Sequence, residues 1–250
     1  MPTSPDGRAR LATSVVMPAY NEAELLERSV GEVVEGMRSL GLPFEVIVVE
    51  NGSRDATATI ADGLATRFDE VTALRLPDPD YGAALRAGLL AAAGDVVVNF
   101  DVDYYDVAFV TDARARLDAS DGPAIVVGSK RAEGARDERS AIRRLVTGVF
   151  SAVLRVGFGL GVSDTHGMKA MRRAVVVPLA RACHSGTDLF DTELVLRAER
   201  AGLRTVELPV VVVERRPSRS PIWRRVPRTL WGLVRLRVLL WRERGPGTVG

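Results

Sequence analysis

The chain has 250 residues, of which 46% are hydrophobic and 26% charged, a balance that excludes a disordered or fibrous protein and is typical of a soluble globular one. At this length we expect one domain with an appendage. Cys183 is the only cysteine, which excludes an internal disulfide and fits a reducing compartment, and residues 1–10 lack the apolar core of a secretory signal.

Strand and helix signals alternate from residue 14 to residue 100. Buried strands are expected at 14–18, 44–49, 71–76 and around 96–98, and helices follow the first three of them, at about 21–40, 55–68 and 81–90. Asn21 stands three residues before Glu24, a spacing typical of a capping box at the start of the first helix. Because right-handed crossovers place such strands side by side, the pattern predicts an α/β fold with a doubly wound, mostly parallel sheet flanked by helices.

Two common nucleotide-binding motifs are missing from this pattern. No strand is followed by G-x-G-x-x-G, and no G-x-x-x-x-G-K-[ST] occurs, which argues against dinucleotide-binding and P-loop proteins. The helix at 81–90 instead has many small residues on one face. Such a face permits the close approach of a ligand, or of the sheet on which the helix packs.

The second half of the chain continues with further elements. We expect a helix at 107–117, a strand at 124–129, a basic amphipathic helix at 139–155, a loop at 164–169, a helix at 188–201 and a last strand at 205–213.

Two acids follow the fourth strand. Val96 to Val98 is an apolar run typical of a central parallel strand, and Asp101 and Asp103 stand at its carboxyl end, where open α/β sheets bind ligands. The two side chains would point apart on a regular strand but can converge if the chain turns there, and converging carboxylates favour a divalent cation between them. From this stretch alone, a solvated turn that caps the next helix is an equal alternative.

The end of the chain is strongly basic. Residues 215–244 contain ten arginines and one acid, so this stretch has a net charge of +9 and the rest of the chain −7. From 222 to 241, tryptophans, leucines and valines lie among the arginines. This mixture is too charged to span a bilayer and suits an interfacial helix on an anionic membrane surface. Docking on the body by the apolar side of the helix is the main alternative, and the two can coexist. No recognised nucleic-acid-binding fold is present, so no nucleic-acid partner is expected.

Five separated stretches together resemble glycosyltransferase family 2, the inverting nucleotide-sugar enzymes with the GT-A fold. They are Val15 to Glu22, Val48 to Asp55, Gly82 to Gly88, Asp101 to Asp103 and Phe190 to Leu194, and they follow the family's order within residues 14–221. Within the family the chain is most similar to the polyprenyl-phosphate sugar synthases of the dolichyl-phosphate mannose synthase kind. That likeness rests on Gly128-Ser129-Lys130, on Arg143 and Thr147, and on Asp164 to Lys169.

The chain departs from these relatives in three places. Residues 215–221 stand where the relatives have Arg-x-x-Gly-x-Ser-Lys, and here Ser218 replaces the glycine and Pro221 the lysine. Glu50 stands where the second strand usually ends in aspartate, and two tyrosines, Tyr104 and Tyr105, follow the paired acids. At the tyrosines we expect the protein to differ from its relatives.

The resemblance implies a donor site at the ends of the first strands. Its residues would be Pro18, Ala19, Tyr20, Glu22, Glu50, Gly52, Asp55, Gly82 and Asp101. Asp103, together with Asp101, would hold Mg²⁺ or Mn²⁺ on the diphosphate of GDP-mannose or a UDP-hexose, where a cation neutralises the charge of the leaving group. Attack from the opposite face of the anomeric carbon would invert its configuration.

The resemblance also implies polyprenyl phosphate as the acceptor. A phosphate monoester has a second pKa of about 6, so its oxygen is already anionic at neutral pH and needs no general base. The protein must then hold two anionic substrates together, which calls for cations near the acceptor. The implied acceptor-phosphate residues are Lys130, Arg143, Thr147, Arg215, Arg219 and Ser220, and the implied catalytic residues are Asp103, Lys169 and Asp191. Taken singly, each cation is as well explained as a solvated surface charge.

Two other functions stay open. A soluble member of the family that glycosylates a hydroxyl of a small metabolite would need a general base, for which Asp191 or Glu193 is the candidate. His166 is a further candidate, although a lone histidine in a loop is more often structural. A nucleotide-sugar-binding protein without catalysis is the third hypothesis.

The expected organisation follows from these assignments. Residues 1–12 form a flexible tail, 13–214 the GT-A glycosyltransferase domain, and 215–250 a basic amphipathic tail at the membrane surface or the acceptor site. A lipid-linked acceptor predicts a cytoplasmic protein that is peripheral on the inner face of the cell membrane.

Overall fold

The structure is a computed structural model that describes residues 11–130, 132, 136–137, 141–162, 165, 167–186, 189–212 and 222–243. For 136–137, 141–147, 212 and 222–228 it describes the backbone alone.

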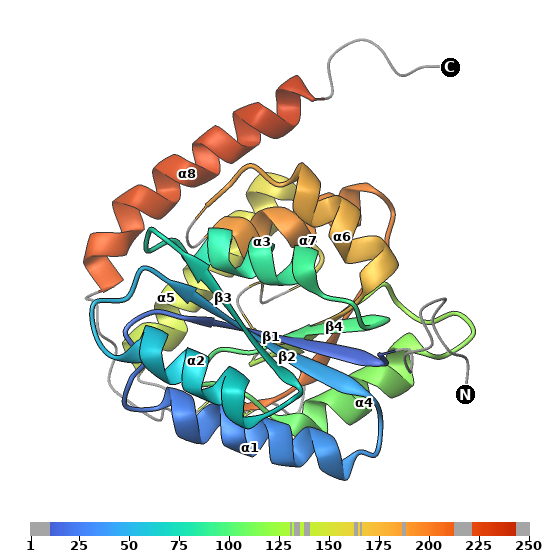
Figure 1. Ribbon diagram of the computed structural model, residues 1–250. Coiled ribbons are helices and arrows are strands. Elements are labelled where there is room, and N and C mark those ends of the chain that lie inside the picture. The colour runs from blue at the N-terminus through green and yellow to red at the C-terminus, as the bar shows by residue number, and fades with distance from the viewer. Residues whose placement is uncertain are drawn as a thin grey trace.

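A seven-stranded sheet lies at the centre, in the order β3-β2-β1-β4-β7-β5-β8 (Figure 1). Its strands are β1 (Thr13–Ala19), β2 (Phe44–Asn51), β3 (Val71–Leu76), β4 (Val96–Asn99), β5 (Ile125–Ser129), β7 (Lys169–Arg172) and β8 (Thr205–Pro209). Strand β7 is antiparallel to β4 and β5, and all other pairings in this sheet are parallel. The predicted mostly parallel α/β sheet is confirmed. A second, two-stranded sheet pairs β6 (Arg136–Asp137) with β9 (Val211–Val212).

Helices cover both faces of the large sheet (Figure 1). One face carries α1 (Leu26–Ser39), α2 (Thr57–Arg67) and α4 (Val107–Leu117), and the other carries α3 (Tyr81–Ala91), α6 (Arg173–Ala182) and α7 (Phe190–Arg200). Strand β1 shows why both faces are apolar, because Val15 and Met17 belong to the first core and Val16 to the second. Such double-sided burial accounts for the unbroken apolar runs of the central strands.

Two further helices pack together beside α7. They are α5 (Ala141–Phe158) and α8 (Ile222–Arg242), and they share a third apolar cluster with α7. Leu154 of α5, Leu196 of α7 and Leu236 of α8 are each 1–2% exposed in it. Helix α8, within the predicted basic tail, therefore docks on the body by one apolar side. Within the described residues, no helix is long and apolar enough to cross a membrane.

The predicted capping box at Asn21 is wrong. Helix α1 begins at Leu26, and its N-cap, Leu25, makes no side-chain cap hydrogen bond. Residues 22–25 form a turn, and Asn21, with φ of 53°, accepts a hydrogen bond at Oδ1 from the backbone of Arg54, 2.8 Å away. Its side chain joins two loops instead of starting a helix.

Two elements between residues 169 and 182 are absent from the predicted pattern. Strand β7 is four residues long and has basic residues at both ends, and α6 contains Pro178 in its interior. Short length and an internal proline both weaken the sequence signal. The predicted last strand at 205–213 also divides, because the chain leaves the large sheet after Pro209 and pairs again at Val211–Val212.

Candidate functional site

The carboxyl ends of the parallel strands meet at one edge of the sheet. In the register, Ala19 of β1 lies opposite Glu50 of β2, and Asn99 of β4 lies opposite Lys169 of β7. Because β7 runs antiparallel, its first residue lies at the edge where β4 ends. The end of β4, from the first half of the chain, thereby lies next to the start of β7, from the second half.

Asp101 and Asp103 lie on a tight turn directly after β4. The backbones of Asp101 and Tyr104 exchange two hydrogen bonds, of 3.1 and 3.0 Å, which closes the turn. Val102 between the acids is 2% exposed and packs into the core, whereas both acids keep part of their surface exposed. The chain therefore turns at this point, as the predicted convergence of the two carboxylates requires.

The electrostatics of Asp101 reflect this crowding. Burial raises the pKa of its carboxyl to about 6, and the charges of Asp103 and Asp191 add to the rise, while the Tyr81 hydroxyl and the Lys169 ammonium oppose it. The Tyr81 hydroxyl donates to Asp101 Oδ1 over 3.0 Å. A cation beside these acids would stabilise their ionised form. The oxygen donors of the turn fit Mg²⁺ or Mn²⁺, which bind proteins through one or two carboxylates and take further oxygens from substrate phosphate.

Among the described residues, no group of three or more His, Cys, Asp or Glu side chains could hold a metal ion. Within that part of the chain, the two acids of the turn are the candidate ligands for such an ion, and substrate oxygens would complete its coordination.

Lys169 and Asp191 form a buried ion pair beside the acid turn. Lys169 Nζ donates to Asp191 Oδ1 over 2.7 Å and to the Gly167 carbonyl over 2.9 Å. The first residue comes from β7 and the second from the first turn of α7. The Lys169 ammonium is thus directed at Asp191, and one oxygen of Asp191 is already occupied. Asn99, the register partner of Lys169, has a buried Oδ1 without a hydrogen-bond partner in the described part of the chain.

Tyr81 lies beside the acid turn of the candidate site, and the sequence patterns did not single it out. It is the first residue of α3, preceded by the N-cap Asp80, whose Oδ1 accepts a hydrogen bond from the Ala83 backbone over 2.9 Å. This cap directs the helix start toward the acid turn, and the predicted donor residue Gly82 is buried next to it. The only available signal was an aromatic residue at a helix start near the strand ends.

Close packing explains part of the small-residue face of α3. A Cβ at Gly88 would lie 2.2 Å from Val16 Cγ1 of the sheet. At this position the lack of a Cβ allows α3 to pack closely on the sheet.

The loops after β1 and β2 are joined by hydrogen bonds. The backbone N–H of Glu22 donates to Thr57 Oγ1 over 2.7 Å, and that of Asn21 to Ser53 Oγ over 3.0 Å. Although desolvation opposes it, hydrogen bonds from Thr57 and the Ala23 backbone lower the pKa of the Asp55 carboxyl. Asp55 holds the two loops in place through both of its oxygens.

The other predicted donor residues lie along the same edge. Glu50 is 5% exposed and accepts a hydrogen bond from the Ser53 backbone, and Gly52 has φ of 69° with the Pro77 carbonyl 2.7 Å from where a Cβ would be. Pro18 and Ala19 are buried at the end of β1, whereas Tyr20 is 37% exposed.

Lys130 lies over the acid turn from the end of β5. Its ammonium is 5.2 Å from the centre of the Tyr104 ring, a cation–π contact. Tyr105 points elsewhere, since its hydroxyl donates to Glu32 of α1 and its ring contacts Phe100. Tyr104 therefore connects the turn to a predicted acceptor cation, and Tyr105 anchors the turn to the core.

The remaining predicted residues cannot be placed as side chains. Arg143 and Thr147 belong to α5, whose backbone alone is described at these positions, and Arg215, Arg219, Ser220 and His166 lie outside the described residues.

Glu193, the alternative base, lies in a different network. Its side chain is 0% exposed and accepts hydrogen bonds from the backbone of His184 and Ser185 and from Arg197 Nε, the last over 2.8 Å. Arg197 in turn binds both oxygens of Glu243, each over 2.9 Å. This network ties α7 to the end of α8.

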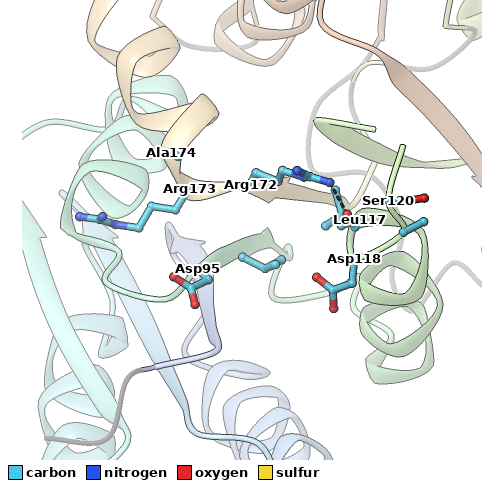
Figure 2. Close-up of a pocket in the computed structure, with 9 residues that line it drawn as sticks. Asp95, Leu117, Asp118, Ser120, Arg172, Arg173 and Ala174 are labelled. Atoms are coloured by element: carbon cyan, nitrogen blue, oxygen red, sulfur yellow. Dashed lines mark hydrogen bonds between the residues drawn. The ribbon is translucent and has the colours of Figure 1, made fainter. Parts of the chain in front are cut away.

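A hollow of about 590 Å³ lies at the opposite end of β4 (Figure 2). It is lined by Asp95, Leu117, Asp118, Arg172 and Arg173, among others. The Arg172 guanidinium donates to the Leu117 carbonyl, and Arg173 Nε donates to the Ala92 carbonyl over 2.6 Å. Both guanidinium groups thus bind backbone carbonyls of the chain itself. The paired acids lie at the other end of β4.

Comparisons with known proteins point to one family. The family model described as "Glycosyl transferase family 2" matches residues 14–177. Glycosyltransferase AglD of Haloferax volcanii is 34% identical over 208 residues, which cover 81% of this chain and 33% of the relative. Dolichyl-phosphate beta-glucosyltransferase ALG5D of Trichomonas vaginalis is 29% identical over 217 residues, which cover 81% of this chain and 66% of the relative. The chain thus spans one third to just under two thirds of these relatives.

A solved structure extends the comparison to the fold. Glucosyl-3-phosphoglycerate synthase from Mycobacterium tuberculosis, in complex with Mn²⁺, uridine diphosphate and phosphoglyceric acid, has a TM-score of 0.62 and 26% identity. The match covers 83% of this chain and 72% of that structure. The mixed sheet with helices on both faces is accordingly a GT-A fold. With the family model covering most of the sheet, the chain belongs to glycosyl transferase family 2.

Proposed function

We propose that the chain transfers a sugar from a nucleoside-diphosphate sugar, GDP-mannose or a UDP-hexose, to polyprenyl phosphate, with inversion at the anomeric carbon. The observation that carries the proposal is the acid turn of Asp101 and Asp103 next to the Lys169–Asp191 pair, at the edge where the strands end. The dolichyl-phosphate glucosyltransferase among the relatives supports the lipid acceptor.

Asp103 and Asp101 would hold Mg²⁺ or Mn²⁺, and the Mn²⁺ and uridine diphosphate bound by the structural relative support this assignment. The ion would offset the charge that develops on the leaving diphosphate. Tyr81 and Lys169 keep Asp101 more acidic than it would otherwise be. The loops joined by Asp55 would carry the nucleotide against Pro18, Ala19, Tyr20, Glu22, Glu50 and Gly52.

The acceptor would enter from the side of Lys130. Its phosphate oxygen is anionic at neutral pH, so the chain needs only cations to hold it, and Lys130 is placed over Tyr104 beside the acid turn. Arg143, Thr147, Arg215, Arg219 and Ser220 would complete the acceptor site. Asp191, held by Lys169, would orient the reacting groups.

The place of action follows from the acceptor. A lipid phosphate is reached at a bilayer, so we assign the chain to the cytoplasmic face of the cell membrane as a peripheral protein, with its basic tail on the anionic surface.

A second candidate is transfer to a hydroxyl of a small metabolite. It is favoured by the likeness to glucosyl-3-phosphoglycerate synthase and by the loss of glycine and lysine from the stretch 215–221. In that reaction Asp191 would have to act as the base, although Lys169 occupies one of its oxygens.

One assay separates the two candidates. Radiolabelled GDP- and UDP-sugars are offered with polyprenyl phosphate or with water-soluble phosphorylated acceptors, each with and without EDTA. The proposal expects label in the organic phase and its loss with EDTA. Label that enters only the water-soluble acceptors would establish the second candidate, and metal-dependent turnover of either kind would exclude a protein that merely binds the donor.

A further inference from the structure

Helix α8 has a second apolar stripe besides the one that docks it. Leu233, Leu236 and Leu240 are 2–3% exposed in the cluster shared with α5 and α7. Trp231, Val234, Val238 and Trp241 are 67%, 64%, 43% and 73% exposed. Because a helix turns once in about 3.6 residues, the two sets lie on different sides of α8. One side is covered by the body, and the other presents apolar surface to the surroundings.

Helix α5 is built in the same way. Leu154 is buried in the shared cluster, whereas Val149, Val153 and Val156 are 58%, 37% and 89% exposed. Their spacing of four and three residues places the valines in one stripe. The two helices are also in contact, since the Arg237 guanidinium of α8 lies 5.6 Å from the centre of the Phe158 ring of α5. Figure 1 shows both helices on the same side of the molecule.

The charges on these helices have one sign. By sequence, α5 contains three arginines and α8 six, and neither helix contains an acidic residue. The exposed arginines include Arg155, Arg235, Arg237 and Arg242, and the Arg235 guanidinium lies 5.8 Å from the centre of the Trp231 ring. Tryptophan and arginine beside an apolar stripe suit the boundary between lipid headgroups and acyl chains.

We propose that the exposed stripes of α5 and α8 together form a docking face for an anionic lipid bilayer. The face thus includes α5 as well as the basic tail, and this inference deepens the proposed function because it names the surface on which the lipid acceptor is met. A second copy of the chain suits the face poorly, since like arginines would oppose one another across a symmetric interface. An anionic bilayer satisfies the arginines and the apolar stripe at once.

The test is binding of the full chain to vesicles without any substrate. Sedimentation with vesicles compares phosphatidylcholine alone with an equal mixture of phosphatidylcholine and phosphatidylglycerol. We expect binding to the mixed vesicles that weakens as salt is raised. Val156→Asp on α5 and Val234→Asp on α8 should each lower the partition coefficient roughly tenfold or more, because an acid replaces apolar surface and repels anionic lipid. Arg235→Gln should lower it about fivefold.

The matched control is Leu42→Asp. Leu42 is 39% exposed after α1, outside the docking face, and its substitution makes the same change of charge. Its binding should stay close to that of the unchanged chain. Thermal unfolding of each variant checks that the fold is kept, and both valines are exposed enough that we expect it to be.

Three results would overturn the inference. They are equal binding to neutral and anionic vesicles, full binding by Val156→Asp, and a dimer in vesicle-free buffer that Val156→Asp dissociates, which would make the face an interface between copies. Vesicle binding as expected with no transfer to polyprenyl phosphate would uphold the docking face and refute only the proposed acceptor.

Discussion

Lys169 and Asp191 form an ion pair of 2.7 Å whose side chains are 0% and 3% exposed. Two buried charges that satisfy each other are tolerated, whereas one left alone is not. The pair therefore links the strand in the middle of the sheet to the helix above it, next to the acid turn.

The first prediction concerns this pair. Lys169→Met and Asp191→Leu should each destabilise the fold by roughly 3–5 kcal/mol, because each leaves an uncompensated buried charge. The double variant should cost clearly less than the two single costs together. Urea unfolding of the four proteins gives the coupling energy, and additive costs would show that the pair does not hold the site together.

The second prediction concerns the proposed metal ligand. Asp103→Asn should reduce sugar transfer by roughly a hundredfold or more, because the leaving diphosphate loses its counter-ion, and should weaken Mn²⁺ binding measured by calorimetry with the donor nucleotide. Asp112→Asn, at an exposed position of α4, is the control and should change neither quantity. Unchanged Mn²⁺ binding in a folded Asp103→Asn protein would remove Asp103 from the metal site.

The third prediction concerns pH. The pKa of Asp101 is raised to about 6, so its ionised form costs folding free energy above that pH, and a bound cation offsets the cost. Cation affinity should accordingly fall as the pH drops through about 6 and protons compete. Stabilisation by Mn²⁺ in thermal unfolding should be larger at neutral pH than well below that value.

Tyr81→Phe provides a sharper form of the same test. Its hydroxyl lowers the pKa of Asp101, so its removal should move the pH dependence of Mn²⁺ binding to higher pH. Tyr105→Phe is the matched control, because the Tyr105 hydroxyl donates to Glu32 of α1. Equal pH profiles for the two variants would contradict the role of Tyr81.

The fourth prediction concerns the clamp between α7 and α8. Glu193→Ala should cost about 1–3 kcal/mol, because it removes the acceptor of two backbone donors and of Arg197 Nε, while Arg197 keeps its bonds to Glu243. Glu243→Gln should cost only about 0.2–1 kcal/mol, since the Glu243 side chain is 40% exposed and screened by water. Arg197 lowers the pKa of Glu243, so this small contribution is present at neutral pH and lost as the pH falls through that pKa. Urea unfolding measures both, and equal costs would contradict the difference in burial.

The fifth prediction uses a pair of glycines. Gly88→Ala should destabilise by roughly 1–3 kcal/mol, because the new methyl would lie 2.2 Å from Val16 Cγ1. Gly63→Ala, inside α2 with no atom within 4 Å of the new methyl, should stabilise by about 0.5–1 kcal/mol. Opposite signs in denaturant unfolding are the expected result, and a neutral Gly88→Ala would show that α3 can shift on the sheet.

Local patterns predicted the alternation of strands and helices up to α4 and the position of the acids after β4. Whether the acids converge depended on a turn, which is stabilised by the burial of Val102 and by two backbone hydrogen bonds. The pairing of Lys169 with Asp191 could be expected only as part of a site, because it arises from the antiparallel placement of β7. Such a short strand has no periodicity of its own, and its neighbours decide its conformation.

The prediction that Asn21 caps the first helix was wrong because its partner is distant in the sequence. The same side chain suits a helix cap or a bond between loops, and the second loop, with Arg54, lies 33 residues away. Tyr81 was missed because its partner, Asp101, lies 20 residues further along the chain. Long-range partners of polar side chains are the part of the site that local patterns leave open.

The position of β7 between β4 and β5 affects the order in which the protein can mature during synthesis. Strand β4 pairs on one side with β1, but its other side stays open until residues 169–172 have been made. Until then the apolar run Val96 to Val98 is an edge strand, able to pair with other nascent chains. Fragments that end before Lys169 should therefore aggregate, and longer chains should escape aggregation once β7 has closed that edge.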